Sequence, residues 1–232
     1  MVVPPRILAR RLRMLAGIAL ALALIALVAA LAAVTWCPPF VHYPVQGIDV
    51  RESHGRIDWF TLRARGVRFA YARATLGAER RDTRFAEYWR GMYEAGIPRG
   101  AIHVFSMCRL AADQVRNFVT TVAPTPEQLP PAVELDFQPD CPARPDRAVL
   151  VNEVRILLAG VEGHLGRRAI LKIPHDFERA YRVSEAVRRP LWAIQPLAPP
   201  NYLARPWTLW QTSSFRRIDG MHEPVNWNVL AP

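Results

Sequence analysis

The sequence of 232 residues lacks the patterns that hold metal ions or nucleotide phosphates. Its six histidines are scattered and none share a His-x-x-x-His spacing, which argues against a zinc-dependent amidase. No glycine-rich loop follows any predicted strand, which argues against a phosphate-loop nucleotide site. We therefore expect a protein with no cofactor and no metal, and we also expect a monomer.

Lysine is nearly absent, because Lys172 is the only lysine among 30 lysine and arginine residues. The formal net charge is +10, and it comes from arginines scattered singly through predicted helices and loops, with few aromatic residues between them. Such scatter does not form the basic stripe of a nucleic-acid-binding protein. We therefore expect no nucleic-acid partner, and an anionic polymer is the expected ligand.

A long uncharged run lies near the amino terminus. Residues 14–34 carry no charge and would form a helix about 30 Å long, enough to cross the hydrocarbon core of a bilayer. Arginines precede it at positions 6, 10, 11 and 13. The positive-inside rule therefore predicts that residues 1–13 form a basic cytoplasmic terminus and that the chain after Thr35 is exported.

A cleaved signal peptide is the alternative, with Ala30-Leu31-Ala32 as its cleavage site. The run is longer than the roughly 7–15 apolar residues of a signal peptide, which favours an uncleaved anchor. We therefore expect a single-pass protein of the inner (cytoplasmic) membrane, with its carboxyl-terminal domain in the periplasm or at the cell exterior.

Residues 35–45 are predicted to be a linker, and residues 46–232 a single α/β domain. Eight strands are expected at residues 46–50, 68–74, 101–106, 129–137, 169–174, 190–195, 207–212 and 225–230. The first five are each followed by a helix, at residues 56–66, 83–96, 111–122, 146–163 and 176–182, whereas the last three are joined by loops without helices. This order predicts an irregular TIM-like barrel of five β/α units followed by three β-strands.

Two acidic residues lie within the predicted strand of residues 129–137. Glu134 and Asp136 are two positions apart, so their carboxyl groups project to one face of the strand. Two carboxylates in one small space repel each other, which makes the pair costly for folding alone. A solvated edge strand is the alternative, but the flanking residues are apolar and typical of a core. We therefore interpret the pair as part of an active site.

Polar residues gather at the carboxyl ends of the predicted strands, where barrels of this kind have their active sites. They are Asp49, Arg73, His103, Glu134, Asp136, Gln195, Gln211 and Asn226. Two of the three cysteines, Cys108 and Cys141, also follow predicted strands. In an exported protein they are expected to form a disulfide beside the acidic pair, and two free buried thiols are the alternative.

Four stretches of the sequence resemble the glycoside hydrolase family 25 lysozymes, which are N-acetylmuramidases of the Chalaropsis type. These stretches are residues 47–50 with 57–59, residues 69–75 with Gly77, residues 100–105, and residues 210–211 with 225–228. The resemblance covers about residues 46–230 and implies a barrel of five strand–helix units and three further strands. It also implies cleavage of the β-1,4 bond between N-acetylmuramic acid and N-acetylglucosamine in peptidoglycan.

The sequence departs from the family pattern where the resemblance places the chemistry. Similar members carry Asp-x-Glu on the fourth strand, with the Glu as proton donor, whereas this chain has Glu134-x-Asp136. Asp136 takes the donor's place with a stem one methylene shorter, and a misplacement near 1 Å can cost about 100-fold in rate. An acid of the last strand is Asn226 here, and a Glu of the second strand is Leu76, while Asp49 is retained. Returning an acid at position 226 is expected to raise the donor's pKa and the activity.

Two functions compete for this sequence. As an enzyme, the chain is a membrane-anchored muramidase in which Asp136 protonates the glycosidic oxygen, Glu134 and Asp49 stabilise the charge on the sugar, and Asn226 completes the site. Retention of configuration is expected, and the resemblance favours an intermediate formed by the substrate's own 2-acetamido group over one on a carboxylate. As a binding module, the same barrel holds glycan strands without cutting them.

Substrate-binding candidates are Arg73, His103, Trp192, Trp210 and Gln211. The tryptophans either stack on sugar rings or are buried residues of the barrel. For His103, a hydrogen-bonded position in the core is the preferred interpretation.

Overall fold

The computed structural model describes residues 5–232, without the side chains of residues 5–8, 12 and 33–35. The chain divides into two units, Met1–Trp36 and Cys37–Pro232. Residues 1–4 of the expected basic terminus lie outside the described residues.

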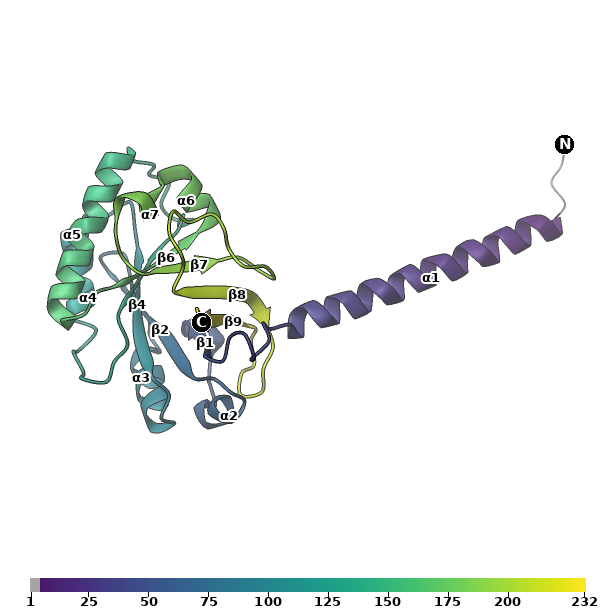
Figure 1. Cartoon of the computed structure of the whole chain (residues 1–232), viewed down its shortest axis with the longest axis horizontal. Helices are drawn as coiled ribbons and strands as arrows, with labels where there is room; N and C mark the ends of the chain where they lie inside the picture. Colours follow the sequence, from purple (N-terminus) through teal and green to yellow (C-terminus); the bar gives the residue numbers. More distant parts are fainter. Residues whose placement is uncertain (1–4) are drawn as a thin grey trace. The chain divides into compact units, whose positions relative to one another are not determined.

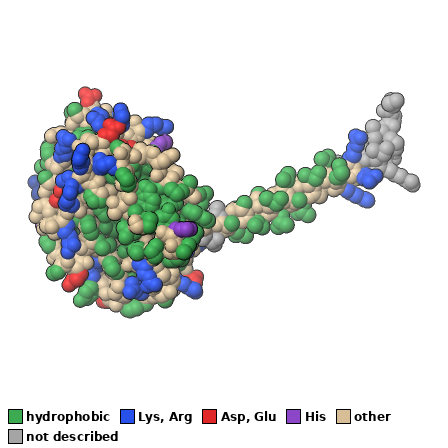
Figure 2. All heavy atoms as spheres, viewed as in Figure 1, with side chains coloured by type: hydrophobic (Ala, Val, Ile, Leu, Met, Phe, Trp, Pro, Cys, Tyr) green, Lys and Arg blue, Asp and Glu red, His purple; other side chains and the backbone are tan. Residues whose placement is uncertain are grey.

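The first unit is a single helix, α1 (Pro5–Thr35). Figure 1 shows it as one continuous helix, and Figure 2 shows hydrophobic side chains along its length, with basic side chains near its start. Its segment Ala9–Ala32 contains an 18-residue stretch with a mean hydropathy of 2.8 and is long enough to cross a membrane. A signal sequence meets the same criteria, so the helix does not decide between an anchor and a cleaved leader.

The second unit is built on a closed barrel of eight strands. They are β1 (Gln46–Val50), β2 (Phe69–Leu76), β4 (Arg99–Phe105), β5 (Ala132–Leu135), β6 (Ile170–Pro174), β7 (Leu191–Ile194), β8 (Leu209–Arg216) and β9 (Val225–Leu230). The first seven of these strands pair in parallel with their neighbours among them, and β9 runs antiparallel between β8 and β1. The predicted eight-stranded barrel is therefore confirmed. A short ninth strand, β3 (Arg80–Arg81), pairs only with the end of β2.

Helices follow the first five barrel strands and pack around them (Figure 1). They are η1 (Glu52–His54), α2 (Trp59–Ala64), α3 (Phe85–Glu94), α4 (Ala111–Val119), α5 (Arg147–Leu165), α6 (His175–Tyr181) and α7 (Val183–Ala186). Local chemistry sets their ends: the Asp58 carboxylate accepts a 3.0 Å hydrogen bond from the Thr61 amide at the start of α2. Helix α5 stops at Gly166, whose φ of 65° suits a residue without a side chain.

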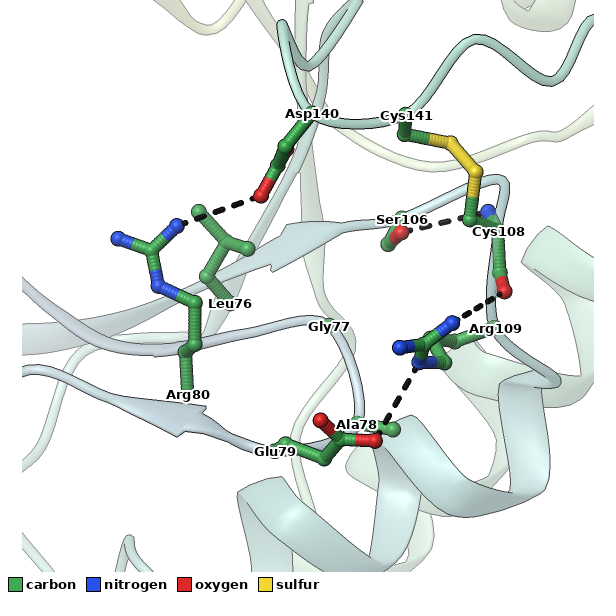
Figure 3. Close-up of a pocket in the computed structure, with 10 residues that line it drawn as sticks. All are labelled: Leu76, Gly77, Ala78, Glu79, Arg80, Ser106, Cys108, Arg109, Asp140 and Cys141. Carbon is green, nitrogen blue, oxygen red and sulfur yellow. Dashed lines mark hydrogen bonds and ion pairs between the residues drawn. A yellow bond between two sulfur atoms is a disulfide. The ribbon is translucent and has the colours of Figure 1, made fainter.

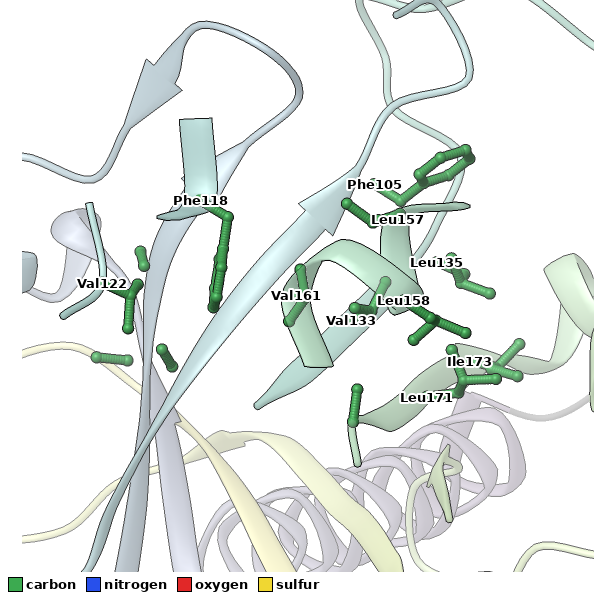
Figure 4. Close-up of a cluster of buried hydrophobic side chains, with 14 of the residues drawn as sticks. Phe105, Phe118, Val122, Val133, Leu135, Leu157, Leu158, Val161, Leu171 and Ile173 are labelled. Carbon is green, nitrogen blue, oxygen red and sulfur yellow. The ribbon is translucent and has the colours of Figure 1, made fainter. Parts of the chain in front are cut away.

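Side chains of β5 alternate between two separate cores. Val133 and Leu135 point outward and pack against α5, as Figure 4 shows with Leu157 and Leu158. Burial of each such side chain contributes about 1.5–3 kcal/mol to folding. Ala132 faces the barrel interior, where it joins a cluster that contains Tyr71, Trp192 and Leu209 among others. Glu134 is two residues from Ala132 and so projects into the interior as well.

Candidate active site

A pocket of about 90 Å³ lies at the carboxyl ends of β1, β2, β4 and β5. It is lined by Asp49, Val50, Arg51, His54, Arg73, Leu76, Ile102, Val104, Glu134, Asp136, Gln138 and Asn226. The structure therefore brings together the four residues predicted to be catalytic, although they come from three separate parts of the sequence. They meet because the carboxyl ends of the parallel strands and the amino end of the antiparallel strand β9 (Val225–Leu230), which carries Asn226, lie on one rim.

The carboxylate of Asp49, at the end of β1, is held by three donors. Its Oδ2 accepts hydrogen bonds from Lys172 Nζ at 2.9 Å and from Asn226 Nδ2 at 2.8 Å, and its Oδ1 accepts one from Asn228 Nδ2 at 2.8 Å. Asn228 is oriented in turn, because its Oδ1 accepts from Trp192 Nε1 at 3.0 Å. Hydrogen bonds of this charge-assisted kind fix the position of the carboxylate.

Glu134 shares the Lys172 ammonium with Asp49. The Lys172 Nζ lies 3.4 Å from Glu134 Oε2, and the side chain of Glu134 is 22% exposed. Sequence reasoning did not assign Lys172 to the site. The available signal was a lone lysine in an otherwise apolar strand.

Asp136 is the first residue beyond β5, and its Oδ1 accepts a 2.7 Å hydrogen bond from the amide of Phe137. Burial raises the pKa of Asp136, and the neighbouring charge of Glu134 raises it further. A raised pKa favours the protonated carboxyl, which is the form that a general acid must have.

Arg73 and His54 complete the polar wall of the pocket. Arg73 forms ion pairs with Glu52 at 3.3 Å and with Asp82 at 3.2 Å, so its guanidinium ties η1 to the barrel. His54, which sequence reasoning missed, is buried, and its Nδ1 accepts from the Arg51 amide at 3.0 Å. Burial lowers the pKa of His54, so the ring is neutral near pH 7 with its proton on Nε2.

His103 does not reach the pocket. Its ring is fully buried on the outer face of β4, where it lies 2.7 Å from Thr75 Oγ1 and 3.1 Å from Gln114 Oε1. Burial lowers the pKa of His103 to about 4. The substrate-binding assignment is therefore replaced by a position in the core, in line with the preferred interpretation above.

Trp192, Trp210 and Gln211 are also buried and do not line this pocket. The Trp192 ring packs against Tyr71 inside the barrel, with a centroid distance of 5.0 Å. Trp210 donates from Nε1 to the carbonyl of Gln195 at 2.7 Å. Their rings are not available for stacking on a sugar in this conformation, so we assign both tryptophans to the packing of the barrel.

A disulfide joins Cys108 and Cys141, with the Cα atoms 5.7 Å apart. It links the loop after β4 to the loop after β5, which also carries Asp136. The bond borders a second pocket of about 90 Å³ that shares Leu76 with the first (Figure 3). Two exposed ion pairs lie there, Arg80 with Asp140 and Arg109 with Glu79.

Among the residues whose side chains the structure describes, no group of three or more His, Cys, Asp and Glu residues is arranged to hold a metal ion. The pocket offers instead carboxyl groups with different surroundings. Asp49 and Glu134 contact an ammonium, whereas Asp136 contacts a single backbone amide. Such different surroundings allow one carboxyl group to keep its proton and act as the acid while its neighbours are negatively charged.

Comparison with known proteins gives a consistent result. The family described as "Glycosyl hydrolases family 25" matches residues 48–221. The uncharacterized protein YegX of Escherichia coli K12 is 30% identical over 199 residues, which span 81% of this chain and 70% of that protein. Lysozyme M1 of Streptomyces globisporus is 46% identical over 59 residues, 25% of this chain and 20% of that protein.

Solved structures show the same fold. A family 25 glycosyl hydrolase from Bacillus anthracis superposes with a TM-score of 0.74 and 27% identity, over 82% of this chain and 90% of that one. The bacterial lysozyme from Streptomyces coelicolor gives a TM-score of 0.73 and 24% identity, over 81% of this chain and 92% of that one.

Proposed function

The chain belongs to glycosyl hydrolase family 25, a family of glycosidases, and we propose that it is a peptidoglycan hydrolase of the lysozyme type. The proposed reaction is cleavage of the β-1,4 bond between N-acetylmuramic acid and N-acetylglucosamine. The observation that carries the proposal is the pocket in which Asp136, with its raised pKa, lies beside Glu134 and Asp49. The family's lysozyme relatives support the choice of substrate.

In the proposed reaction, Asp136 gives its proton to the glycosidic oxygen while the bond between that oxygen and the sugar C1 breaks. Glu134 and Asp49 stabilise the positive charge that develops at C1, because both are negatively charged. The substrate's 2-acetamido oxygen attacks C1 to form the intermediate. Water then attacks C1 and breaks the bond between C1 and the acetamido oxygen, which regenerates the acetamido group. The water gives its proton to the Asp136 carboxylate, which restores the acid, and the two successive inversions at C1 retain the configuration.

The test uses purified peptidoglycan and measures new reducing ends. Asp136→Asn keeps the side-chain volume and removes the titratable proton, so we expect it to lower the rate by at least about 100-fold. Sedimentation with insoluble peptidoglycan should show unchanged binding. Asp113→Asn, at a partly exposed position on α4 outside the pocket, is the matched control and should keep the wild-type rate. Full activity in Asp136→Asn would refute the assignment of the donor.

A catalytically lapsed glycan-binding barrel is the second candidate. It is favoured by two departures from the family pattern, Asn226 and Leu76, both of which line the pocket. For this candidate, wild-type protein sediments with peptidoglycan but releases no reducing ends above background. Retention of Asp49, Glu134 and Asp136 favours the enzyme, because buried charges that serve no chemistry are costly.

For the first unit, we propose that α1 stays attached and anchors the barrel in the inner membrane, with residues 46–232 on the outer side. The uncharged run of residues 14–34 and the arginines before it, at positions 6, 10, 11 and 13, support this orientation. Membranes from expressing cells should retain the full-length chain after a carbonate wash. A mature protein that begins near Thr35 would refute the anchor and support a cleaved signal peptide.

A further inference from the structure

Lys172 is the only lysine in the chain, and it is buried inside the barrel with 1% of its surface exposed. It lies on β6 beside Glu134 on β5 and Trp192 on β7. Its ammonium is 2.9 Å from Asp49 Oδ2, 3.4 Å from Glu134 Oε2 and 4.8 Å from the centroid of the Trp192 ring.

Such a position is costly unless the charge is compensated. Burying an ammonium costs several kcal/mol, and two acidic partners on different strands are needed to offset that cost. Burial alone would lower the pKa of Lys172, but Asp49 and Glu134 outweigh it and the net shift is upward. Lys172 is therefore a cation at all pH values at which the protein would work.

The ammonium contacts one member of the acidic pair and not the other. Two neighbouring carboxyl groups do not both ionise easily, so one of them keeps its proton to a higher pH than an isolated carboxyl would. An ammonium at 3.4 Å stabilises the negative charge on Glu134. Asp136 has the Phe137 amide as its hydrogen-bond partner, and Asp176 on α6 adds a second negative charge that raises the pKa of Asp136. Lys172 also lowers the pKa of Asp136, but this is the smallest of the effects on that carboxyl, because the two groups form no ion pair.

We propose that Lys172 is a positioning residue that keeps the negative charge of the pair on Glu134 and thereby leaves the proton on Asp136. The inference rests on the proposed function, in which Asp136 is the donor. It explains how the exchanged order of the two acids still yields one acid and one carboxylate.

The other charged or titratable side chains that line the pocket do not perform this task. Arg51 is exposed, and its Nε donates to Ser53 Oγ at 3.1 Å. Arg73 on β2 is paired with Glu52 and Asp82, and His54 at the end of η1 is neutral near pH 7. The amides of Asn226 and Asn228 on β9 bind Asp49 and carry no charge. Asp49 on β1 shares the ammonium with Glu134 and holds its Nζ in place.

The first measurement needs no variant at position 172. Carboxyl ¹³C resonances of the full-length protein, assigned with Asp136→Asn and Glu134→Gln, report which carboxyl keeps the proton as pH is changed. We expect Asp136 to keep its proton to a higher pH than Glu134 does. The reverse assignment in wild-type protein would overturn the inference, whether or not any variant folds.

The second measurement compares Lys172→Met, which has a stem of similar length without charge, with Lys172→Arg, which keeps the charge. In Lys172→Met we expect the proton to be divided between the two carboxyls. The maximum of kcat/KM should then fall by roughly tenfold and the acidic limb of its pH profile should move up by about one pH unit. Lys172→Arg should keep the limb within about 0.3 pH unit of the wild-type position.

The two proposals fail in different ways. If wild-type protein releases no reducing ends but its resonances show a protonated Asp136, the proposed function fails and the role of Lys172 stands. If wild-type protein cleaves peptidoglycan and Lys172→Met changes neither the pH profile nor the proton's position, the role of Lys172 is refuted. A lower melting temperature in Lys172→Met with an unchanged profile would reveal a purely structural residue.

Discussion

The exchanged acidic pair gives the sharpest test of how the site works. The variant Glu134→Asp/Asp136→Glu restores the order that the family resemblance implies. Each methylene moves a carboxyl by more than about 1 Å, because C–C bonds are about 1.5 Å long. The restored donor therefore reaches further toward the glycosidic oxygen, and a correction near 1 Å is worth up to about 100-fold in rate.

The structure adds an opposing effect. Lys172 Nζ is already 3.4 Å from Glu134 Oε2, so shortening Glu134 by one methylene takes this pair beyond the 4 Å range of an ion pair. We assign about a tenfold loss to that change, since it weakens the charge that keeps the proton on position 136. The double variant should then be about tenfold faster than wild type.

The single variants should show that the two positions are coupled. Glu134→Asp alone should be about tenfold slower, because it loses the contact with Lys172 and leaves the short donor in place. Asp136→Glu alone places two long acids in one space, so the donor is displaced and most of its gain is lost. Rates of reducing-end release should therefore be strongly non-additive.

The assay compares initial rates on purified peptidoglycan for wild type and the three variants, with Asp136→Asn as the zero reference. Melting temperatures exclude differences in folding. If wild type cleaves well and the double variant is slower, the exchange is an adapted active site and the reasoning from donor length is refuted. If only the double variant cleaves, the wild-type barrel is a lapsed enzyme.

Three further predictions concern stability and charge. Asn226→Asp replaces the amide that donates to Asp49 at 2.8 Å with a second carboxylate. Because the two carboxylates repel each other, activity and melting temperature should fall at pH 8 and partly recover at pH 5. A higher rate than wild type at pH 8 would contradict this prediction. Replacing Cys108 and Cys141 with serine removes a disulfide between residues 33 positions apart in the sequence. The free energy of unfolding, measured with urea, should fall by about 4 kcal/mol, and a fall below about 1 kcal/mol would contradict this prediction. His103 has a pKa of about 4 in the folded protein, so the unfolded chain binds a proton at this residue at higher pH than the folded protein does. The free energy of unfolding of wild type should therefore fall by about 3 kcal/mol between pH 6.5 and pH 4. His103→Gln should lack that loss, and equal pH dependence in both proteins would refute the assignment.

The barrel was predictable from sequence because its strands and helices alternate in a regular order. Strand β5 is evident from its apolar run, and the spacing of Glu134 and Asp136 is enough to place both acids on one face of that strand. The two-residue strand β3 and the short helix α7 were missed, since segments of two and four residues carry no periodic signal.

Convergence of Asp49, Glu134, Asp136 and Asn226 was predictable for a related reason, because strand ends in a closed barrel share one rim. Which side chains of β4 and β7 face the barrel interior, and which face outward, could not be predicted. Both faces of these strands are buried, so the sequence lacks the polar alternation that would have placed His103 outside and Trp192 inside. Lys172 was missed because its role depends on its neighbours in space, Asp49 and Glu134.

Asn226 shows how a substitution changes meaning once its contacts are known. From sequence alone, an amide in place of an acid is a lost charge, and returning the acid is expected to help. In the structure the Asn226 amide is one of three donors to Asp49, together with Lys172 and Asn228. An acid at this position would face the Asp49 carboxylate, so the contacts predict the opposite effect of Asn226→Asp.

The charged side chains around Lys172 therefore compensate one another in part. Asp49 and Glu134 share the Lys172 ammonium, and Asp136 retains its proton in the proposed arrangement, so these four side chains together carry one net negative charge where positive charge develops during cleavage. Replacing buried ion pairs with apolar residues is often neutral or stabilising. A barrel that only held glycan strands would gain stability by losing Lys172 and its partners. Their presence, with donors matched to Asp49 and Glu134, favours catalysis over binding alone.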